Sequence, residues 1–180
     1  MKRSRSIRLL MMGASAVALT ACDEPKIDAV IYDGIQQCLA DGLLTREQCQ
    51  TEYERAREAH VAAAPKYTSA EACEADFGPA QCEQAPQQTT SGGSVFMPLM
   101  MGYMMGSMLA GNRAGVATQP LYRSADDPKS FRTADNRNVG ATTGRTQVAR
   151  AAAAAPSVKT RTTARGGFGA SARAFGSAAG

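Results

Sequence analysis

Four cysteines constrain the fold of this 180-residue chain more than any other feature. They are Cys38, Cys49, Cys73 and Cys82. An even number of cysteines in a short exported chain is typical of a disulfide framework, and four thiols allow three pairings. We expect two short-range pairs, because Asp41-Gly42 lies as a turn signal inside the first pair and Gly78-Pro79 inside the second.

Two other arrangements of these cysteines are weaker. A twin helical hairpin with bridges between its helices needs each pair on one continuous helix, and Gly42 and Pro79 interrupt both. A zinc site needs short chelating pairs, and these pairs have ten and eight intervening residues. The prediction is therefore disulfides at Cys38–Cys49 and Cys73–Cys82, with no metal and no cofactor.

The first 22 residues indicate export. A basic start is followed by an apolar run over residues 9–19, which is too short to span a membrane, since a spanning helix needs ~20 residues. Leu19-Thr-Ala-Cys22 then resembles the bacterial lipobox, whose cysteine receives diacylglycerol and, at its freed amine, a fatty acid such as palmitate. We predict a signal peptide over 1–21 and lipid at Cys22; the alternative is a secreted protein with a chance cysteine there. Asp23 and Glu24 resemble an enterobacterial sorting signal that favours the inner over the outer membrane, with the protein facing the periplasm.

Charge divides the chain into blocks. Residues 23–88 carry 13 acidic and 5 basic side chains, whereas residues 113–180 carry 11 basic and 3 acidic ones. An uncharged apolar tract lies between them. The predicted organisation is an acidic, disulfide-stapled helical domain over 22–87, a linker over 88–94, a Met/Gly-rich apolar segment over 95–111 and a basic disordered tail over 112–180.

Periodic apolar residues predict helices in the acidic block, and the fold class is therefore expected to be mainly α. Between Ile27 and Leu39, apolar residues recur at the three- and four-residue spacing of one helix face. Ala29 to Tyr32 could equally form a strand. Thr45 and Gln48 form a capping box for a second helix that Pro65 ends. Thr68 and Glu71 form a second capping box, which starts a short third helix. Gly78 is placed to cap the C-terminus of that helix.

The apolar segment, residues 95–110, holds six of the nine methionines. Gly102, Gly106 and Ala110 are spaced by four, the small-residue pattern that lets helices approach closely in lipid. Self-association, contact with an envelope protein, and contact with the membrane are all open, as are a simple linker and a cover for the small core. The predicted contact residues are Phe96, Met97, Met100, Met101, Gly102, Met104, Met105, Gly106, Met108 and Ala110. Copper is the alternative ligand, since thioethers are soft donors, but metal-handling methionine clusters normally include His or Cys, and none lies nearby in sequence.

The basic tail is rich in Ala, Gly, Ser, Thr and Arg, which predicts disorder. Arg165-Gly-Gly-Phe-Gly resembles an RNA-binding element, but export argues against nucleic acid. Anionic lipid, cell-wall polymer or an acidic protein face is the expected contact of this tail, and the alternative is a solvated tail with no fixed partner. Catalysis has no support, because the single histidine, His60, falls on the inner stripe of a predicted helix and no nucleophile or phosphate-loop motif is present.

Several strings resemble the YgiB-like family of uncharacterised bacterial lipoproteins. They are Met1-Lys-Arg-Ser-Arg-Ser-Ile-Arg, Ala64-Pro-Lys-Tyr, Cys73 to Cys82 with Phe77-Gly78, Gln84-Ala-Pro, Phe96-Met-Pro-Leu-Met-Met-Gly-Tyr-Met-Met-Gly, Gln119-Pro-Leu-Tyr and Arg165-Gly-Gly-Phe-Gly. The signal region and the Gln-rich linker are shorter here than in the family. The resemblance implies no activity, catalytic residue or cofactor. Neighbouring genes of some relatives resemble ATP-grasp ligases, which implies an accessory role in an envelope pathway as a further alternative.

The sequence therefore predicts a non-catalytic binding or scaffolding component of the bacterial envelope, held to the membrane by lipid at Cys22.

Overall fold

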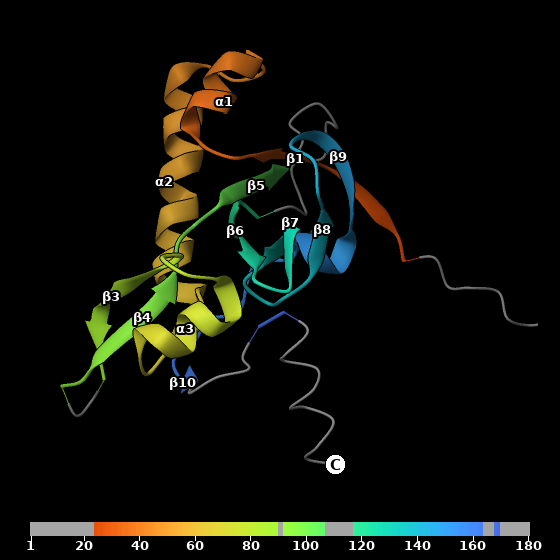
Figure 1. The fold of residues 1–180 in the computed structure, drawn as a ribbon. Coiled ribbons are helices and arrows are strands. Elements are labelled where there is room, and N and C mark those ends of the chain that lie inside the picture. Colours follow the sequence, from red (N-terminus) through yellow and green to blue (C-terminus); the bar gives the residue numbers. More distant parts are fainter. Residues whose placement is uncertain (1–23, 90–91, 107–116, 164–167, 170–180) are drawn as a thin grey trace, which may run out of the picture.

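The structure is a computed structural model that describes residues 24–89, 92–106, 117–163 and 168–169 (Figure 1). The helices are α1 (Ile35–Asp41), α2 (Arg46–Ala63) and α3 (Ala70–Phe77). The strands are β1 (Lys26–Tyr32), β2 (Lys66–Tyr67), β3 (Cys82–Gln88), β4 (Ser94–Pro98), β5 (Gly102–Gly106), β6 (Gln119–Ser124), β7 (Asp127–Thr133), β8 (Asn138–Gly140), β9 (Gly144–Ala149) and β10 (Thr162–Thr163), and a 3-10 helix covers Arg150–Ala153. More described residues lie in strands than in helices, so the expectation of a mainly α fold with a disordered tail is wrong.

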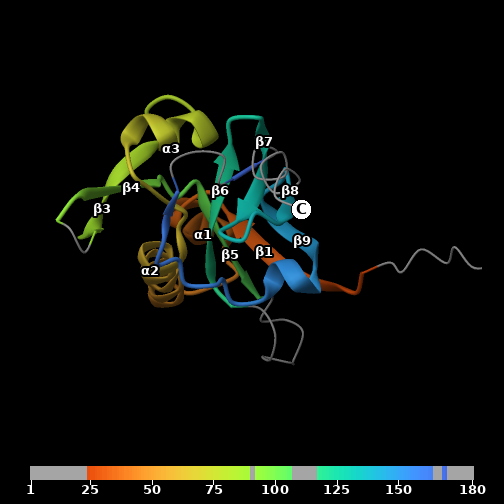
Figure 2. The same cartoon turned by 90° about the horizontal axis from the view of Figure 1, so that it is seen from below.

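Two sheets organise the molecule. The larger has the strand order β8-β7-β6-β5-β1-β9 and curls until its edge strands, β8 and β9, lie side by side (Figures 1 and 2). The smaller has the order β10-β2-β4-β3. Helix α2 packs against β5 and β6, and α3 packs on the smaller sheet. None of the helices in the described ranges is long and apolar enough to cross a membrane.

The N-terminal part of the first predicted helix is a central strand. In β1, Ala29 and Ile31 enter one core cluster while Val30 and Tyr32 enter another on the opposite face. A strand that is buried on both faces is apolar at every position, so it lacks the alternation that marks a half-exposed strand. Residues 27–31 matched helical spacing for this reason, and only the part after Gly34 is helical, as α1.

The Met/Gly-rich segment also forms strands instead of a separate apolar helix. Strand β5 pairs with β1 and β6, and Gly102 to Met105 are all buried. Gly102 is small because a Cβ there would lie 2.7 Å from the carbonyl oxygen of Tyr32. Its position between paired strands, and not helix contact in lipid, explains the glycine.

The basic tail supplies strands β6 to β10. Each tail strand of the larger sheet, β6 to β9, contributes only one or two large apolar side chains, so the composition of the tail resembles that of a disordered chain. Leu121, Phe131, Val139 and Val148 nevertheless meet β1 and β5 in one core cluster. Phe168, from the Arg165-Gly-Gly-Phe-Gly string, is 1% exposed and packs on Phe77 of α3.

Local signals in the acidic block are confirmed. Thr45 and Gln48 form the capping box of α2, and α2 ends at Ala63, before Pro65. Helix α3 ends at Phe77 with Gly78 as its C-cap, as expected, although Ser69 and not Thr68 caps its start. The predicted disulfides Cys38–Cys49 and Cys73–Cys82 are both present. The first joins α1 to α2, and the second joins α3 to β3.

Candidate functional site

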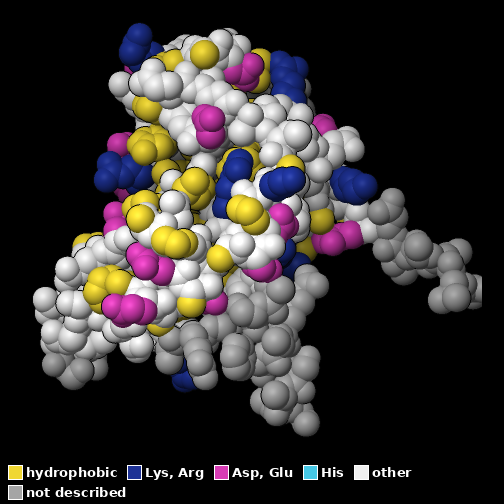
Figure 3. Space-filling view, in the orientation of Figure 1, with side chains coloured by type: hydrophobic (Ala, Val, Ile, Leu, Met, Phe, Trp, Pro, Cys, Tyr) yellow, Lys and Arg dark blue, Asp and Glu magenta, His cyan; other side chains and the backbone are white. Residues whose placement is uncertain are grey.

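A cleft of about 770 Å³ lies between α2, β3 and the residues that follow β4, and we call it the α2–β3 cleft. It is lined by Tyr53, Glu54, Arg57, Glu58, His60, Val61, Glu83, Gln84, Pro86, Met97, Leu99, Met100 and Met101. Figure 3 shows hydrophobic side chains reaching the surface along α2 and the β3–β4 hairpin, with acidic side chains among them.

The cleft combines an apolar wall with an acidic rim. Leu99, Met100 and Met101 are half-buried and supply apolar surface. Three carboxylates and one guanidinium line the same space, which gives it a formal charge of −2 if all are ionised. The Glu54–Arg57 pair is exposed at both ends and joined at 3.7 Å, so it holds the rim only weakly. The cleft therefore suits an apolar group that carries positive charge.

A hydrogen-bonded chain runs from the core to this cleft through His60. The Nδ1 of His60 lies 2.9 Å from the Tyr122 hydroxyl, and its Nε2 lies 3.3 Å from Glu83 Oε1. A neutral imidazole fits this chain as the Nε2–H tautomer, with the tyrosine O–H donating to Nδ1 and Nε2–H donating to the carboxylate. Burial raises the pKa of Tyr122 well above its ordinary value, so the hydroxyl keeps its proton.

This chain has the composition of a catalytic triad but the opposite polarity. In a triad the nucleophile faces the substrate and the carboxylate is buried. Here the hydroxyl belongs to Tyr122, which is fully buried, whereas the side chain of Glu83 is 45% exposed. The tyrosine oxygen therefore has no access to a substrate, and the chain serves to fix α2 against β3 and β6.

Stability should depend on pH through His60. Burial lowers the pKa of His60 below its ordinary value of 6.5, and the Glu83 carboxylate opposes this only in part. A depressed folded pKa means that the stabilisation is complete above about pH 6.5 and is lost as the pH falls toward the folded value. We expect unfolding in denaturant at pH 7.5 and 5.5 to show a lower free energy at pH 5.5, with a slope of up to about 1.4 kcal/mol per pH unit. In His60→Asn this slope should disappear, since the chain has no other histidine; an unchanged slope would contradict the assignment.

The predicted apolar contact residues have different surroundings. Met97, Gly102, Met104 and Met105 are buried, whereas Phe96, Met100, Met101 and Gly106 are partly exposed. Met108 and Ala110 lie outside the described residues, as do the signal peptide and Cys22.

The described methionines of this segment also do not form one cluster. They are divided among three core clusters, with Met97 in the first, Met101 and Met104 in the second, and Met100 and Met105 in the third. The described part of the chain holds no group of three or more His, Cys, Asp or Glu side chains placed to bind a metal. Met97, Met100 and Met101 nevertheless all line the α2–β3 cleft.

Two buried acidic residues were not anticipated. Glu52 on α2 is 5% exposed, pairs with Arg55 at 2.5 Å and accepts a hydrogen bond from Thr118. Asp76 on α3 accepts hydrogen bonds from the Tyr67 hydroxyl at 2.7 Å and from the Phe168 N–H at 3.1 Å. Each carboxylate also has one partner far away in the sequence, Thr118 for Glu52 and Phe168 for Asp76, and no local pattern could have revealed those two contacts.

Comparison with known proteins places the chain in a family. The model described as "Protein of unknown function (DUF1190)" matches residues 26–178. The chain belongs to this DUF1190 family. Among relatives, a UPF0441 protein from Erwinia tasmaniensis is 39% identical over 188 residues, covering 93% of this chain and 83% of the relative. Others are a UPF0441 protein from Sodalis glossinidius, 40% identical over 172 residues (89% and 78% covered), and one from Pectobacterium carotovorum, 38% identical over 184 residues (93% and 81% covered).

Membership in the DUF1190 family agrees with the resemblance to the YgiB-like proteins. The family model covers β1 and the strands of the basic tail together, so the tail is part of the family domain. No solved structure matches this chain.

Proposed function

We propose that this DUF1190 protein is a non-catalytic binding component of the bacterial cell envelope, tethered by lipid at Cys22 and facing the periplasm. The observation that carries the binding role is the α2–β3 cleft, whose apolar wall and acidic rim suit a cationic apolar group. The two disulfides support an oxidising compartment. The lipobox-like Leu19-Thr-Ala-Cys22 supports the tether, and Asp23 favours the inner membrane.

The arrangement of titratable groups supports binding over catalysis. The Tyr122–His60–Glu83 chain is buried at its hydroxyl end, so this triad-like set of residues lacks an accessible nucleophile. Met100 and Leu99 offer flexible apolar surface at the cleft wall, which favours adaptable contact with a partner. An accessory role beside a ligase-like enzyme is a variant of this proposal, in which that enzyme is the partner.

One in-cell experiment tests both the tether and the cleft. We expect the native chain to take up a clickable fatty acid and Cys22→Ser to lose that label completely. A photo-crosslinking amino acid at Met100 should give a specific crosslinked product, and adding Glu58→Gln should weaken it because one rim charge is removed. The matched control places the crosslinker at Arg46, which is exposed at the start of α2 and outside the cleft.

The possible outcomes test the lipid tether and the binding role of the cleft separately. Fatty acid on Cys22→Ser, or none on the native chain, rejects the tether. A product of equal strength from Arg46, or no product from Met100, rejects the cleft as the binding surface.

A further inference from the structure

A second surface of the molecule gathers positive charge. A cavity of about 280 Å³ lies where the residues after α2 meet the turn after β7 and the segment leading into β10. It is lined by Pro65, Lys66, Ala134, Asp135, Asn136, Lys159, Arg161 and Thr163. Three cations and one carboxylate face this small space, which gives a formal charge of +2 when all are ionised.

The backbone holds these residues in place. The N–H of Lys159 donates to the carbonyl of Ala62 at 3.0 Å, at the end of α2. Thr162 and Thr163 then pair in parallel with Lys66 and Tyr67. The basic residues after 157 were expected to lie in a disordered tail, and the fold instead fixes them beside Lys66.

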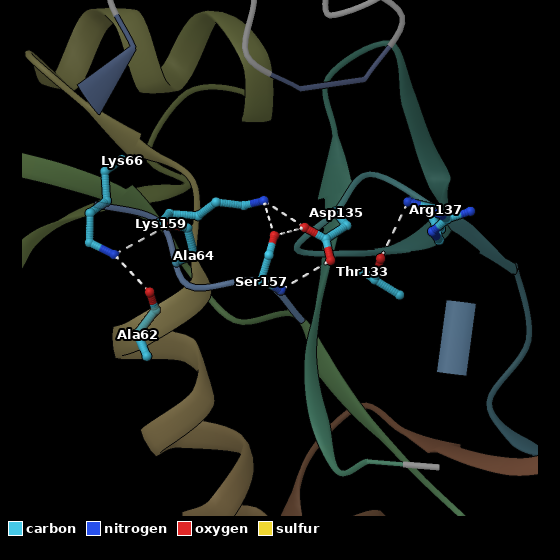
Figure 4. A network of polar contacts seen from close by, with 8 residues as sticks. All are labelled: Ala62, Ala64, Lys66, Thr133, Asp135, Arg137, Ser157 and Lys159. Carbon is cyan, nitrogen blue, oxygen red and sulfur yellow. Dashed lines mark hydrogen bonds and ion pairs between the residues drawn. The ribbon is translucent and has the colours of Figure 1, made fainter. Parts of the chain in front are cut away.

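Two of the three cations are engaged by the protein (Figure 4). Lys66 is 8% exposed and donates to the carbonyls of Val61, Ala62 and Ala64 at 3.1, 3.3 and 3.5 Å, which accounts for all three of its N–H groups.

Lys159 has one donor left. Its ammonium donates to Asp135 Oδ1 at 2.5 Å and to Ser157 Oγ at 2.7 Å, so one of its three N–H groups has no acceptor among the described residues. Burial raises the pKa of Asp135, but hydrogen bonds from Lys159 and Ser157 outweigh it and hold that pKa below its ordinary value. The carboxylate therefore stays ionised and neutralises only one of the three positive charges.

Arg161 is uncommitted. It is exposed, and within the described ranges of the chain no hydrogen bond or ion pair holds its guanidinium. A free guanidinium offers five N–H donors in a planar fork that matches the oxygens of an oxyanion. The cations of the site repel one another. The pKa of Lys66 lies below its ordinary value, first because the side chain is buried and second because the charge of Lys159 is close.

The cavity adjoins a larger apolar-lined space. A groove of about 650 Å³ shares Lys66, Lys159 and Arg161 with it and continues past Val61, Val95 and Val158. Val158 is 67% exposed, so its side chain offers apolar surface to a ligand in the groove. A ligand with an anionic group beside an organic group would contact both spaces.

We infer that Lys159 and Arg161, supported by the charge of Lys66, form a binding site for a phosphate ester, with the phosphate in the cavity and the organic group along the groove. Arg161 supplies a bidentate contact and Lys159 its remaining N–H. The cavity that would hold the phosphate shares no lining residue with the α2–β3 cleft, and the groove shares Val61 with it. The site does not require lipid at Cys22.

The test uses the full chain carrying Cys22→Ser, so that attached lipid cannot contribute. Titration with inorganic phosphate at constant ionic strength, followed by NMR, should give saturable shifts at Lys159 and Thr163. Arg161→Gln should weaken the apparent affinity by about tenfold or more, since it removes a charge-assisted contact. Arg46→Gln is the matched control, because it removes an exposed arginine elsewhere, and it should leave the affinity unchanged.

A second arm identifies the source of the phosphate. Sedimentation with phosphatidylglycerol vesicles that depends on Arg161, and is absent with phosphatidylcholine, assigns the site to an anionic lipid headgroup. Saturable phosphate binding without sedimentation assigns it to a soluble or wall-linked phosphate ester. Shifts that do not saturate, or that are equal in Arg161→Gln and the parent chain, overturn the inference, and circular dichroism of each variant verifies that it is folded.

Discussion

Phe168→Ala should destabilise the fold by about 3–5 kcal/mol, the usual cost of truncating a fully buried phenylalanine. The Phe168 ring lies 4.7 Å from that of Phe77 and 6.0 Å from that of Tyr122, between centroids. Its loss would leave a cavity between α3 and β6, where the surroundings cannot close fully. Thermal unfolding should show a melting temperature lower by roughly 10 °C.

Val158→Ala is the matched control for this experiment. Val158 lies in the same C-terminal region but is 67% exposed, so its truncation should change the free energy of unfolding by less than about 0.5 kcal/mol. If Phe168→Ala is as stable as Val158→Ala, the C-terminal segment does not contribute to the core and the assignment of Phe168 fails.

Reduction of the two disulfides should have a comparable effect. The bridges close loops with sequence separations of 11 and 9, and each contributes about 3 kcal/mol in the loop-entropy model. Together they approach the whole stability of an ordinary domain, about 5–15 kcal/mol. In strong reductant we expect the far-ultraviolet circular dichroism of the native chain to lose its helical signal near room temperature.

Single-bridge variants apportion this effect. Cys38→Ala with Cys49→Ala removes the α1–α2 bridge, and Cys73→Ala with Cys82→Ala removes the α3–β3 bridge. Each double substitution should lower the free energy of unfolding by about half of the loss that reduction of both bridges causes. A helical signal that survives strong reductant would show that the core alone holds the fold.

The features that could be predicted from sequence are those with local causes. The capping box of Thr45 and the termination near Pro65 define α2 within 20 residues of chain, and the short-range disulfides bracket their own turns. Strand β5 was missed, and β1 was predicted only as an alternative to a helix, because both faces of each strand are buried and neither alternates. Their pairing with each other, as in Ala29 with Gly106, joins segments far apart in the sequence. The tail strands were missed because each depends on a few side chains, such as Phe131, that gain a partner only across the sheet.

In the candidate site, too, the features with local causes could be predicted and those that depend on distant partners could not. His60 was expected to be a packed side chain from its place on the inner stripe of α2, and it is buried there against Tyr122. Its partners Glu83 and Tyr122 lie 23 and 62 residues away, so neither could be assigned from spacing. Arg161 lies in a segment whose composition indicated disorder. The pairing of β10 with β2, together with the bond from the Lys159 N–H to Ala62, brings it beside Lys66.

The start of β1 at Lys26 sets how far the domain can stand from a bilayer if Cys22 carries lipid as proposed. Four residues of extended chain reach at most about 14 Å, and the headgroup layer occupies roughly 5–7 Å of that distance. The sheet end at Lys26 would thus rest almost on the headgroups, while α2 and β3, on the opposite side in Figures 1 and 2, would point outward. The cleft would then lie no farther from the bilayer than the diameter of the domain. This short distance favours ligands that are themselves held at the membrane.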